Sequence, residues 1–190
     1  MDALNLQLFH WLAAGYAPNP LLLDLARLAS LGASWVGIAL MASALWRHAP
    51  ERVYLVVLCL LAAFASMLAR AVAGELDVPR PFMLGLSPPH IDHAQRGGLP
   101  STHASVMFTV ALGCLWRPRL RSVGWLLTAM ALLTALARIH VGMHFPIDIA
   151  AGLLLAMVLV MPLAAAQARA GKQAAGRVGN TAASRMEAAS

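Results

Sequence analysis

The stretch RIHVGMHFPID, from Arg138 to Asp148, gathers an arginine, two histidines and an aspartate between two long apolar runs. Pro146 suits the first position of a helix, which places His144 just before that helix and Asp148 in its first turn. A carboxylate within reach of an imidazole fixes the tautomer of the ring and raises its basicity. Ionisable residues beside membrane spans are costly, so this stretch predicts a functional site built around His144.

Two further clusters carry groups that suit a phosphate. Arg80 lies between two prolines in VPRPF, which hold it on an extended segment, and a guanidinium group matches the geometry of a phosphate. In GGLPSTHAS, Ser101 is a candidate N-cap, so the helix after it would present free N–H groups to an anion. His103 would lie in the first turn of that helix. Gly97 and Gly98 would let the backbone approach a ligand closely.

Together the three clusters predict phosphoryl transfer through a phosphohistidine. His144 would attack the phosphorus, and His103 would protonate the leaving oxygen. Arg80, Arg138 and the N–H groups of the second cluster would stabilise charge on the equatorial oxygens.

A zinc site is the alternative for the same histidines. His140 and His144 are four residues apart, a spacing that can ligate zinc on a helix. The segment HIDH contains three further candidate ligands, His90, Asp92 and His93. Gly142 and Pro146 interrupt a continuous helix, however, and no glutamate lies between His140 and His144. We therefore predict no metal site.

Membrane-spanning helices must position these clusters. The 190 residues are 60% hydrophobic and 12% charged, with a mean hydropathy of +0.70, whereas soluble domains carry roughly 25% charged residues. Five runs can cross a hydrocarbon core of about 30 Å as helices. They are Leu28–Trp46, Val53–Ala73, Leu99–Trp116, Ser122–Ala137 and Pro146–Ala166. The predicted fold class is an all-α integral membrane helical bundle.

Two segments flank these spans. At the N-terminus, an amphipathic helix is expected to lie at the membrane interface, with Leu4, Leu8, Trp11 and Leu12 on one face. Residues 1–166 would form the membrane domain. The basic tail, residues 167–190, lacks apolar periodicity and is expected to be disordered in the cytoplasm.

Basic residues predict the orientation of the spans. With five spans, nine of them fall on one side: Arg47, Arg52, Arg117, Arg119, Arg121, Arg169, Lys172, Arg177 and Arg185. The positive-inside rule places these in the cytoplasm, which explains the net charge of +6 without a nucleic-acid partner. The 74–100 loop and the Arg138–Phe145 connection would then meet at the outer face.

The motifs RP at 80–81, PSTH at 100–103 and R-x5-H-x3-D at 138–148 resemble the three signatures of the type 2 phosphatidic acid phosphatase superfamily. Within it, residues 1–166 look most like the bacitracin-resistance type of undecaprenyl-diphosphatase. The resemblance implies a lipid phosphatase without a metal or other cofactor, facing the periplasm from a bacterial inner membrane. It implies His144 as nucleophile, Asp148 as its partner and His103 as general acid. The implied phosphate ligands are Arg80, Ser101, Thr102 and Arg138.

The chain departs from the family pattern at two positions. Ala73 stands where the first motif usually has a lysine, and Arg70, one turn earlier on the same helix, is the candidate replacement. Ala137 stands where a serine usually precedes the third motif. The expected partners are a lipid phosphate or diphosphate substrate and the membrane lipids.

Other functions remain open at this point. The chain could hydrolyse phosphatidic acid or phosphatidylglycerol phosphate, or it could be a non-enzymatic membrane protein that binds an anion. A haloperoxidase is a further alternative, which the five spans disfavour.

Overall fold

The computed structural model describes residues 3–92 and 95–187, with side chains as far as Arg169. These residues form an all-helical protein. The α-helices are α1 (Ala3–Leu12), α2 (Pro20–Arg47), α3 (Arg52–Leu76), α4 (Thr102–Leu115), α5 (Arg121–His140) and α6 (Pro146–Glu187). Three short 3-10 helices join them: η1 (Ala49–Glu51), η2 (Pro81–Leu84) and η3 (Pro118–Leu120). The predicted all-α fold class is confirmed.

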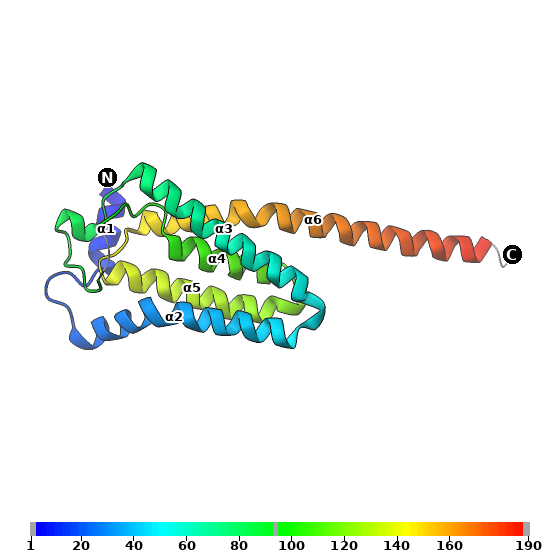
Figure 1. Ribbon diagram of the computed structural model, residues 1–190, viewed down its shortest axis with the longest axis horizontal. Coiled ribbons are helices and arrows are strands. Elements are labelled where there is room, and N and C mark those ends of the chain that lie inside the picture. The colour runs from blue at the N-terminus through cyan, green and yellow to red at the C-terminus, as the bar shows by residue number, and fades with distance from the viewer. Residues whose placement is uncertain (1–2, 93–94, 188–190) are drawn as a thin grey trace.

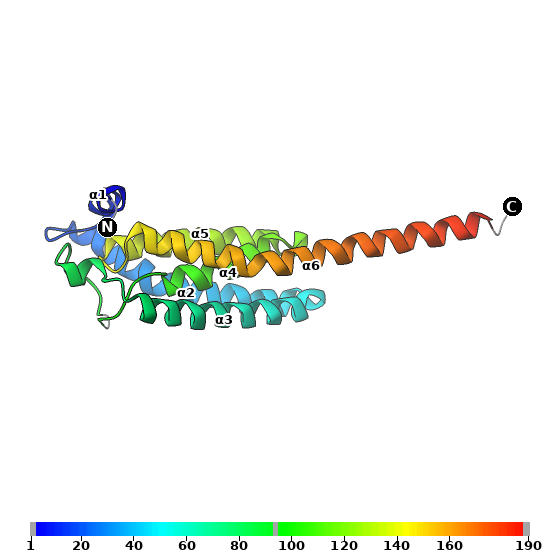
Figure 2. The same ribbon diagram turned by 90° about the horizontal axis from the view of Figure 1, so that it is seen from above.

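Helices α2 to α6 run side by side, and α1 lies across one end of the bundle (Figures 1 and 2). The centre of the bundle is α4, which packs against α3, α5 and α6, while α2 packs mainly on α5. Few contacts join α2 to α3. These two helices therefore flank α4 without closing on each other.

Four segments of the described chain are long and apolar enough to cross a membrane: Pro20–Arg47, Ala49–Leu84, Pro118–His140 and Pro146–Arg169. The remaining predicted span is the shorter apolar helix α4, which begins at Thr102 instead of Leu99. Its 14 residues rise only about 21 Å. The difference arises because residues 97–101 are used in the loop that precedes α4.

Small residues allow the inner helices to pack closely. The buried face of α3 is built largely of alanines: Ala62, Ala65, Ala69 and Ala73. In α6, a Cβ atom added at Gly152 would lie 2.8 Å from the Cβ of Ala104 in α4. Large apolar side chains such as Trp35 and Leu60 point outward instead. This arrangement suits helices that pack through small residues and face lipid with large ones.

At the end of the bundle opposite α1, the two short loops η1 and η3 are joined by ion pairs. Glu51 is buried and lies 3.5 Å from both Arg117 and Arg119. The guanidinium of Arg117 also stacks over the ring of Tyr54. The basic loops predicted to share one side of the membrane are therefore at the same end of the molecule.

Helix α1 forms where the N-terminal helix is predicted. It buries Asn5 and Phe9 against the bundle and exposes Leu4, Trp11 and Leu12. Its axis lies across the ends of the long helices (Figure 1), as expected for a helix in the plane of the interface.

The C-terminal segment differs from the expectation of a disordered tail. Helix α6 continues past Ala166 as far as Glu187 and extends beyond the rest of the bundle (Figure 1). The physical reason is composition, because the segment after Ala166 is rich in alanine, the residue with the highest helix propensity.

Candidate active site

The loop between α3 and α4 and the connection between α5 and α6 meet at the α1 end of the bundle. The N–H of Ser101 donates to the carbonyl of Asp148 at 2.9 Å, and the N–H of His90 donates to the carbonyl of Val141 at 3.4 Å. The prediction that these segments meet at one end of the molecule is confirmed. Ser101 caps α4, Pro146 begins α6 and Asp148 lies in the first turn of α6, all as predicted.

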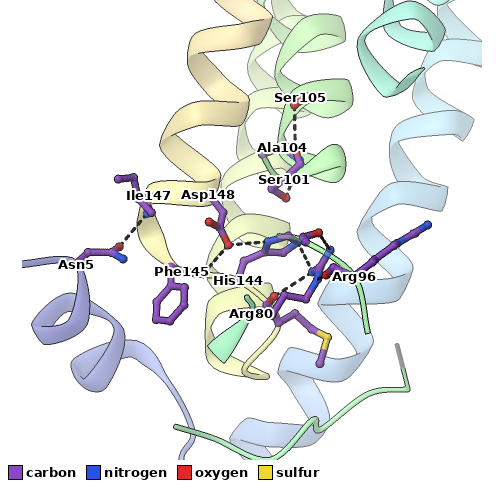
Figure 3. Close-up of polar contacts among 12 residues, drawn as sticks. Asn5, Arg80, Arg96, Ser101, Ala104, Ser105, His144, Phe145, Ile147 and Asp148 are labelled. Atoms are coloured by element: carbon purple, nitrogen blue, oxygen red, sulfur yellow. Dashed lines mark hydrogen bonds and ion pairs between the residues drawn. The ribbon is translucent and has the colours of Figure 1, made fainter. Parts of the chain in front are cut away.

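His144 and Asp148 form a buried pair (Figure 3). The Nδ1 atom of His144 lies 3.1 Å from Oδ2 of Asp148, and the same oxygen accepts the N–H of Phe145 at 3.0 Å. On the other side of the ring, Nη1 of Arg80 lies 3.0 Å from Nε2 of His144. A neutral ring with its proton on Nδ1 satisfies both contacts, because Arg80 can only donate. The lone pair of Nε2 is then the reactive position.

Burial lowers the pKa of His144 to about 4. The largest cause is loss of hydration, which disfavours the charged ring, and the positive charge of Arg80 acts in the same direction. The hydrogen bond that His144 donates to Asp148 opposes this shift without cancelling it. The ring is therefore neutral, and able to act as a nucleophile, at neutral pH.

Arg80 is held by three backbone carbonyls from two segments, the loop before α4 and the connection between α5 and α6 (Figure 3). It donates to the carbonyls of Arg96 at 2.9 Å, Met143 at 3.0 Å and Gly97 at 3.2 Å. A guanidinium group held by three hydrogen bonds loses little conformational freedom when it binds an anion. The side chain is buried beside the Nε2 atom of His144.

Gly97 and Gly98 bring the loop close to other parts of the chain. A Cβ atom on Gly98 would lie 3.0 Å from Oδ2 of Asp148 and 3.1 Å from Cγ of Arg80. A Cβ atom on Gly97 would collide with the carbonyl oxygen of Ala73 at the end of α3. The absence of a side chain at these glycines lets the loop pass directly over the site residues and the end of α3.

A second arginine–histidine pair comes from α5 and α4. Nη2 of Arg138 lies 3.0 Å from Nε2 of His103. Arg138 is only 3% exposed, and its Nε and Nη1 atoms have no hydrogen-bond partner among the described residues. Buried donors in this state suit an anionic ligand, since leaving them unpaired is costly.

The remaining predicted phosphate ligands border the site in different ways. Ser101 is fully buried, and its Oγ lies 3.5 Å from the N–H of Ala104 as the cap of α4. Thr102 is half-buried in the first turn of α4. Arg70 is exposed on α3 and lines the same cavity as Thr102 and His103.

This cavity has a volume of about 640 Å³ and lies between α2, α3 and α4. Thr102, His103 and Arg70 line one part of it, and Cys59 and Leu45 line another. From Arg70 to Cys59 its wall on α3 spans about 16 Å along the helix. The lining between these positions is almost entirely apolar. The sequence could not reveal this cavity, because hydropathy does not report the spacing between helices.

The alternative metal ligands make other contacts. The Nδ1 atom of His140 lies 2.7 Å from the carbonyl of Leu12, and Nε2 of His90 lies 2.9 Å from the carbonyl of Gly15. The two histidines therefore attach the end of α1 and the segment after it to the bundle. His93 lies outside the described residues. Within the described ranges, no three histidine, cysteine, aspartate or glutamate residues are grouped to hold a metal ion.

The profile of the PAP2 superfamily matches residues 53–172, which include all three motifs. The chain belongs to the PAP2 superfamily. It is 32% identical over 160 residues to YbjG of Escherichia coli, for which undecaprenyl-diphosphatase activity is assigned provisionally, covering 83% of this chain and 80% of that protein. It is 35% identical over 81 residues to the undecaprenyl-diphosphatase BcrC of Bacillus subtilis, covering 43% of this chain and 41% of that protein.

Two solved structures share the fold. LpxE of Aquifex aeolicus superposes with a TM-score of 0.66 at 24% identity, covering 84% of this chain and 94% of that one. A PAP2-type phosphatidylglycerolphosphate phosphatase of Bacillus subtilis superposes with a TM-score of 0.63 at 16% identity, covering 88% and 85%. The expected family is confirmed, and the chain is a multi-span membrane phosphatase of the PAP2 type.

Proposed function

We propose that this PAP2 phosphatase hydrolyses undecaprenyl diphosphate to undecaprenyl phosphate and inorganic phosphate through a phosphohistidine on His144. The observation that carries the proposal is the buried chain of contacts from Asp148 through His144 to Arg80. It gives a neutral imidazole whose Nε2 lone pair faces a fixed positive charge. That is the arrangement a nucleophile needs when it attacks an anionic phosphorus centre.

In the first step, Nε2 of His144 attacks the terminal phosphorus and the bond from that phosphorus to the bridging oxygen breaks. His103, in its protonated form, donates a proton to the departing oxygen of undecaprenyl phosphate. Arg80 and Arg138 would stabilise the equatorial oxygens, with Nε and Nη1 of Arg138 available as donors. Substrate oxygens would replace the contacts that the arginines make with His144 and His103.

In the second step, water attacks the phosphorus of the phosphohistidine and His103 removes its proton. The N–P bond breaks, inorganic phosphate leaves and His144 returns to its neutral form. Asp148 accepts the Nδ1–H bond throughout and stabilises the positive charge that the ring carries as phosphohistidine.

The apolar cavity supports a lipid substrate. Its polar part, at His103, Thr102 and Arg70, adjoins the proposed site, and its apolar part could hold the first portion of a polyprenyl chain. Arg70 lines this cavity and would bind the phosphate that stays with the lipid, which would favour a diphosphate over a monophosphate. The undecaprenyl-diphosphatase BcrC, and YbjG with its provisional assignment to the same activity, support the same substrate.

We further propose that the site faces the periplasm from the inner membrane. The basic loops at η1 and η3 lie at the end of the bundle opposite α1, and positive charge favours the cytoplasmic side.

The test is phosphate release by detergent-purified protein in EDTA from three lipids: undecaprenyl diphosphate, phosphatidic acid and phosphatidylglycerol phosphate. The wild type is compared with His144→Gln and with a matched control, His10→Gln, which replaces an exposed histidine on α1. Substrate labelled with ³²P in the terminal phosphate, quenched in alkali to preserve phosphohistidine, would show the covalent intermediate.

We expect EDTA-resistant release that is fastest with undecaprenyl diphosphate, lost in His144→Gln and retained in His10→Gln. Preference for phosphatidic acid or phosphatidylglycerol phosphate would reassign the substrate and keep the mechanism. Release that depends on a metal, or that survives in His144→Gln, would refute the mechanism.

A further inference from the structure

A side chain of the N-terminal helix reaches the beginning of α6. Asn5 in α1 is only 8% exposed, and its Oδ1 accepts the N–H of Ile147 at 3.1 Å (Figure 3). These residues are 142 positions apart in the chain. Ile147 is the second residue of α6, so its N–H has no acceptor within the helix. Asn5 therefore acts as a helix cap supplied by a different helix.

The reason for this cap lies in the residues that begin α6. Phe145 occupies the N-cap position, where its apolar side chain cannot accept a hydrogen bond. Asp148, the third helical residue, accepts the N–H of Phe145 with Oδ2 and donates its own N–H to the Phe145 carbonyl at 3.0 Å. This resembles one half of a capping box. The acceptor that a serine or aspartate would normally supply to Ile147 comes from Asn5.

A second contact joins the same two segments. The rings of Phe9 and Phe145 pack with centroids 5.1 Å apart, and both side chains are almost fully buried. Asn5 and Phe9 lie four residues apart, on the same face of α1. Helix α1 thus holds the first turn of α6 by one hydrogen bond and one ring contact.

The turn held in this way is the one that aligns the proposed nucleophile. Oδ2 of Asp148 is shared between the N–H of Phe145 and Nδ1 of His144. Any rotation of the first turn of α6 changes the distance from that oxygen to the imidazole. We propose that Asn5 is a positioning residue of this site, which acts through Asp148 on His144. The inference rests on the proposed phosphohistidine mechanism.

Two substitutions at this position separate the hydrogen bond from packing. Asn5→Leu keeps a similar volume but leaves the N–H of Ile147 without its acceptor, and Asn5→Asp keeps an acceptor oxygen in the same place. We expect Asn5→Leu to lower kcat about tenfold with little change in KM, since the loss corresponds to one hydrogen bond. We expect Asn5→Asp to retain most of the wild-type kcat.

The matched control is Leu6→Ala on the same helix. Leu6 packs against the cluster around Phe9, and its side chain has no acceptor for the Ile147 N–H. It should lower the melting temperature at least as much as Asn5→Leu while retaining kcat. A loss of kcat in Leu6→Ala equal to that in Asn5→Leu would overturn the proposal, because general loosening of α1 would then explain both.

A double-mutant cycle tests whether Asn5 acts through Asp148. In the Asp148→Asn background, adding Asn5→Leu should lower kcat by less than about twofold, since the carboxylate through which Asn5 acts is already replaced. If the kcat losses of the two single variants multiply in the double variant, the proposal is overturned. Full activity in His144→Gln would instead refute the proposed mechanism, whereas inactive His144→Gln with unaffected Asn5→Leu would refute only the role of Asn5.

Discussion

Replacement of Asp148 by asparagine isolates the charge of the carboxylate, because the two side chains have nearly the same shape. Oδ2 of Asp148 accepts from Nδ1 of His144 at 3.1 Å and from the N–H of Phe145 at 3.0 Å. The amide oxygen of asparagine can accept both bonds, so the Nδ1–H tautomer is retained. What is lost is the negative charge beside a ring that becomes cationic as it takes the phosphoryl group.

The expected loss follows from this geometry. A hydrogen bond to a charged group contributes about 1.5–3 kcal/mol, and 1.36 kcal/mol corresponds to a tenfold change in rate. Since the charge develops in the transition state, kcat of Asp148→Asn should fall about 10- to 150-fold with KM almost unchanged. Raising the pH should not restore activity. Without the negative charge of Asp148, which raises the pKa of His144, burial and Arg80 lower that pKa further, so the ring is neutral in both proteins.

The assay is initial-rate phosphate release from undecaprenyl diphosphate at pH 6, 7 and 8. Asp92→Asn is the matched control, because Asp92 is an exposed carboxylate in the loop before α4. Retention of more than half of the wild-type kcat by Asp148→Asn, with His144→Gln inactive, would refute the role assigned to the carboxylate.

Three further predictions follow from the same site. The pKa of His144 is about 4 in the folded protein and 6.5 in the unfolded chain. Its titration therefore contributes about 3 kcal/mol to the free energy of unfolding, which is complete above pH 6.5 and is lost as the pH falls towards 4. Chemical denaturation at pH 7 and pH 4.5 should show a larger decrease in the free energy of unfolding for the wild type than for His144→Gln. Arg70→Gln should raise KM about tenfold for undecaprenyl diphosphate but much less for phosphatidic acid, measured by steady-state kinetics, since the second phosphate loses a charged partner. Equal effects on both lipids would remove Arg70 from diphosphate selection. Gly98→Ala should lower kcat at least tenfold in the same assay, because the added Cβ atom would press on Oδ2 of Asp148 and Cγ of Arg80. An unchanged kcat would show that the loop can move away without disturbing the site.

The fold alone does not select the lipid. LpxE and the phosphatidylglycerolphosphate phosphatase share the arrangement of helices with this chain at 24% and 16% identity. We therefore expect substrate choice to reside in side chains that border the site, and the proposed candidates are Arg70 and the cavity wall.

Local chemistry made much of the structure predictable from the sequence. Apolar runs identified the helices, since backbone groups in a membrane must be paired internally. The roles of Ser101 as a cap, Pro146 as a helix start and Asp148 in the first turn depend on neighbours within a few residues. The alternation of basic and neutral loops further indicated that the clusters around Arg80 and His144 would meet at one end.

Tertiary structure alone decided how these pieces touch. The contact of Arg80 with His144 joins residues 64 positions apart, and the bond from Ile147 to Asn5 joins residues 142 positions apart. Gly97 and Gly98 serve close packing within the chain, and the cavity depends on the separation of α2 from α3. The physical reason is that hydropathy and capping patterns report the surroundings of a residue along its own helix. The rotation and spacing of one helix against another depend on side chains from several segments at once, and these decide which groups meet in the site.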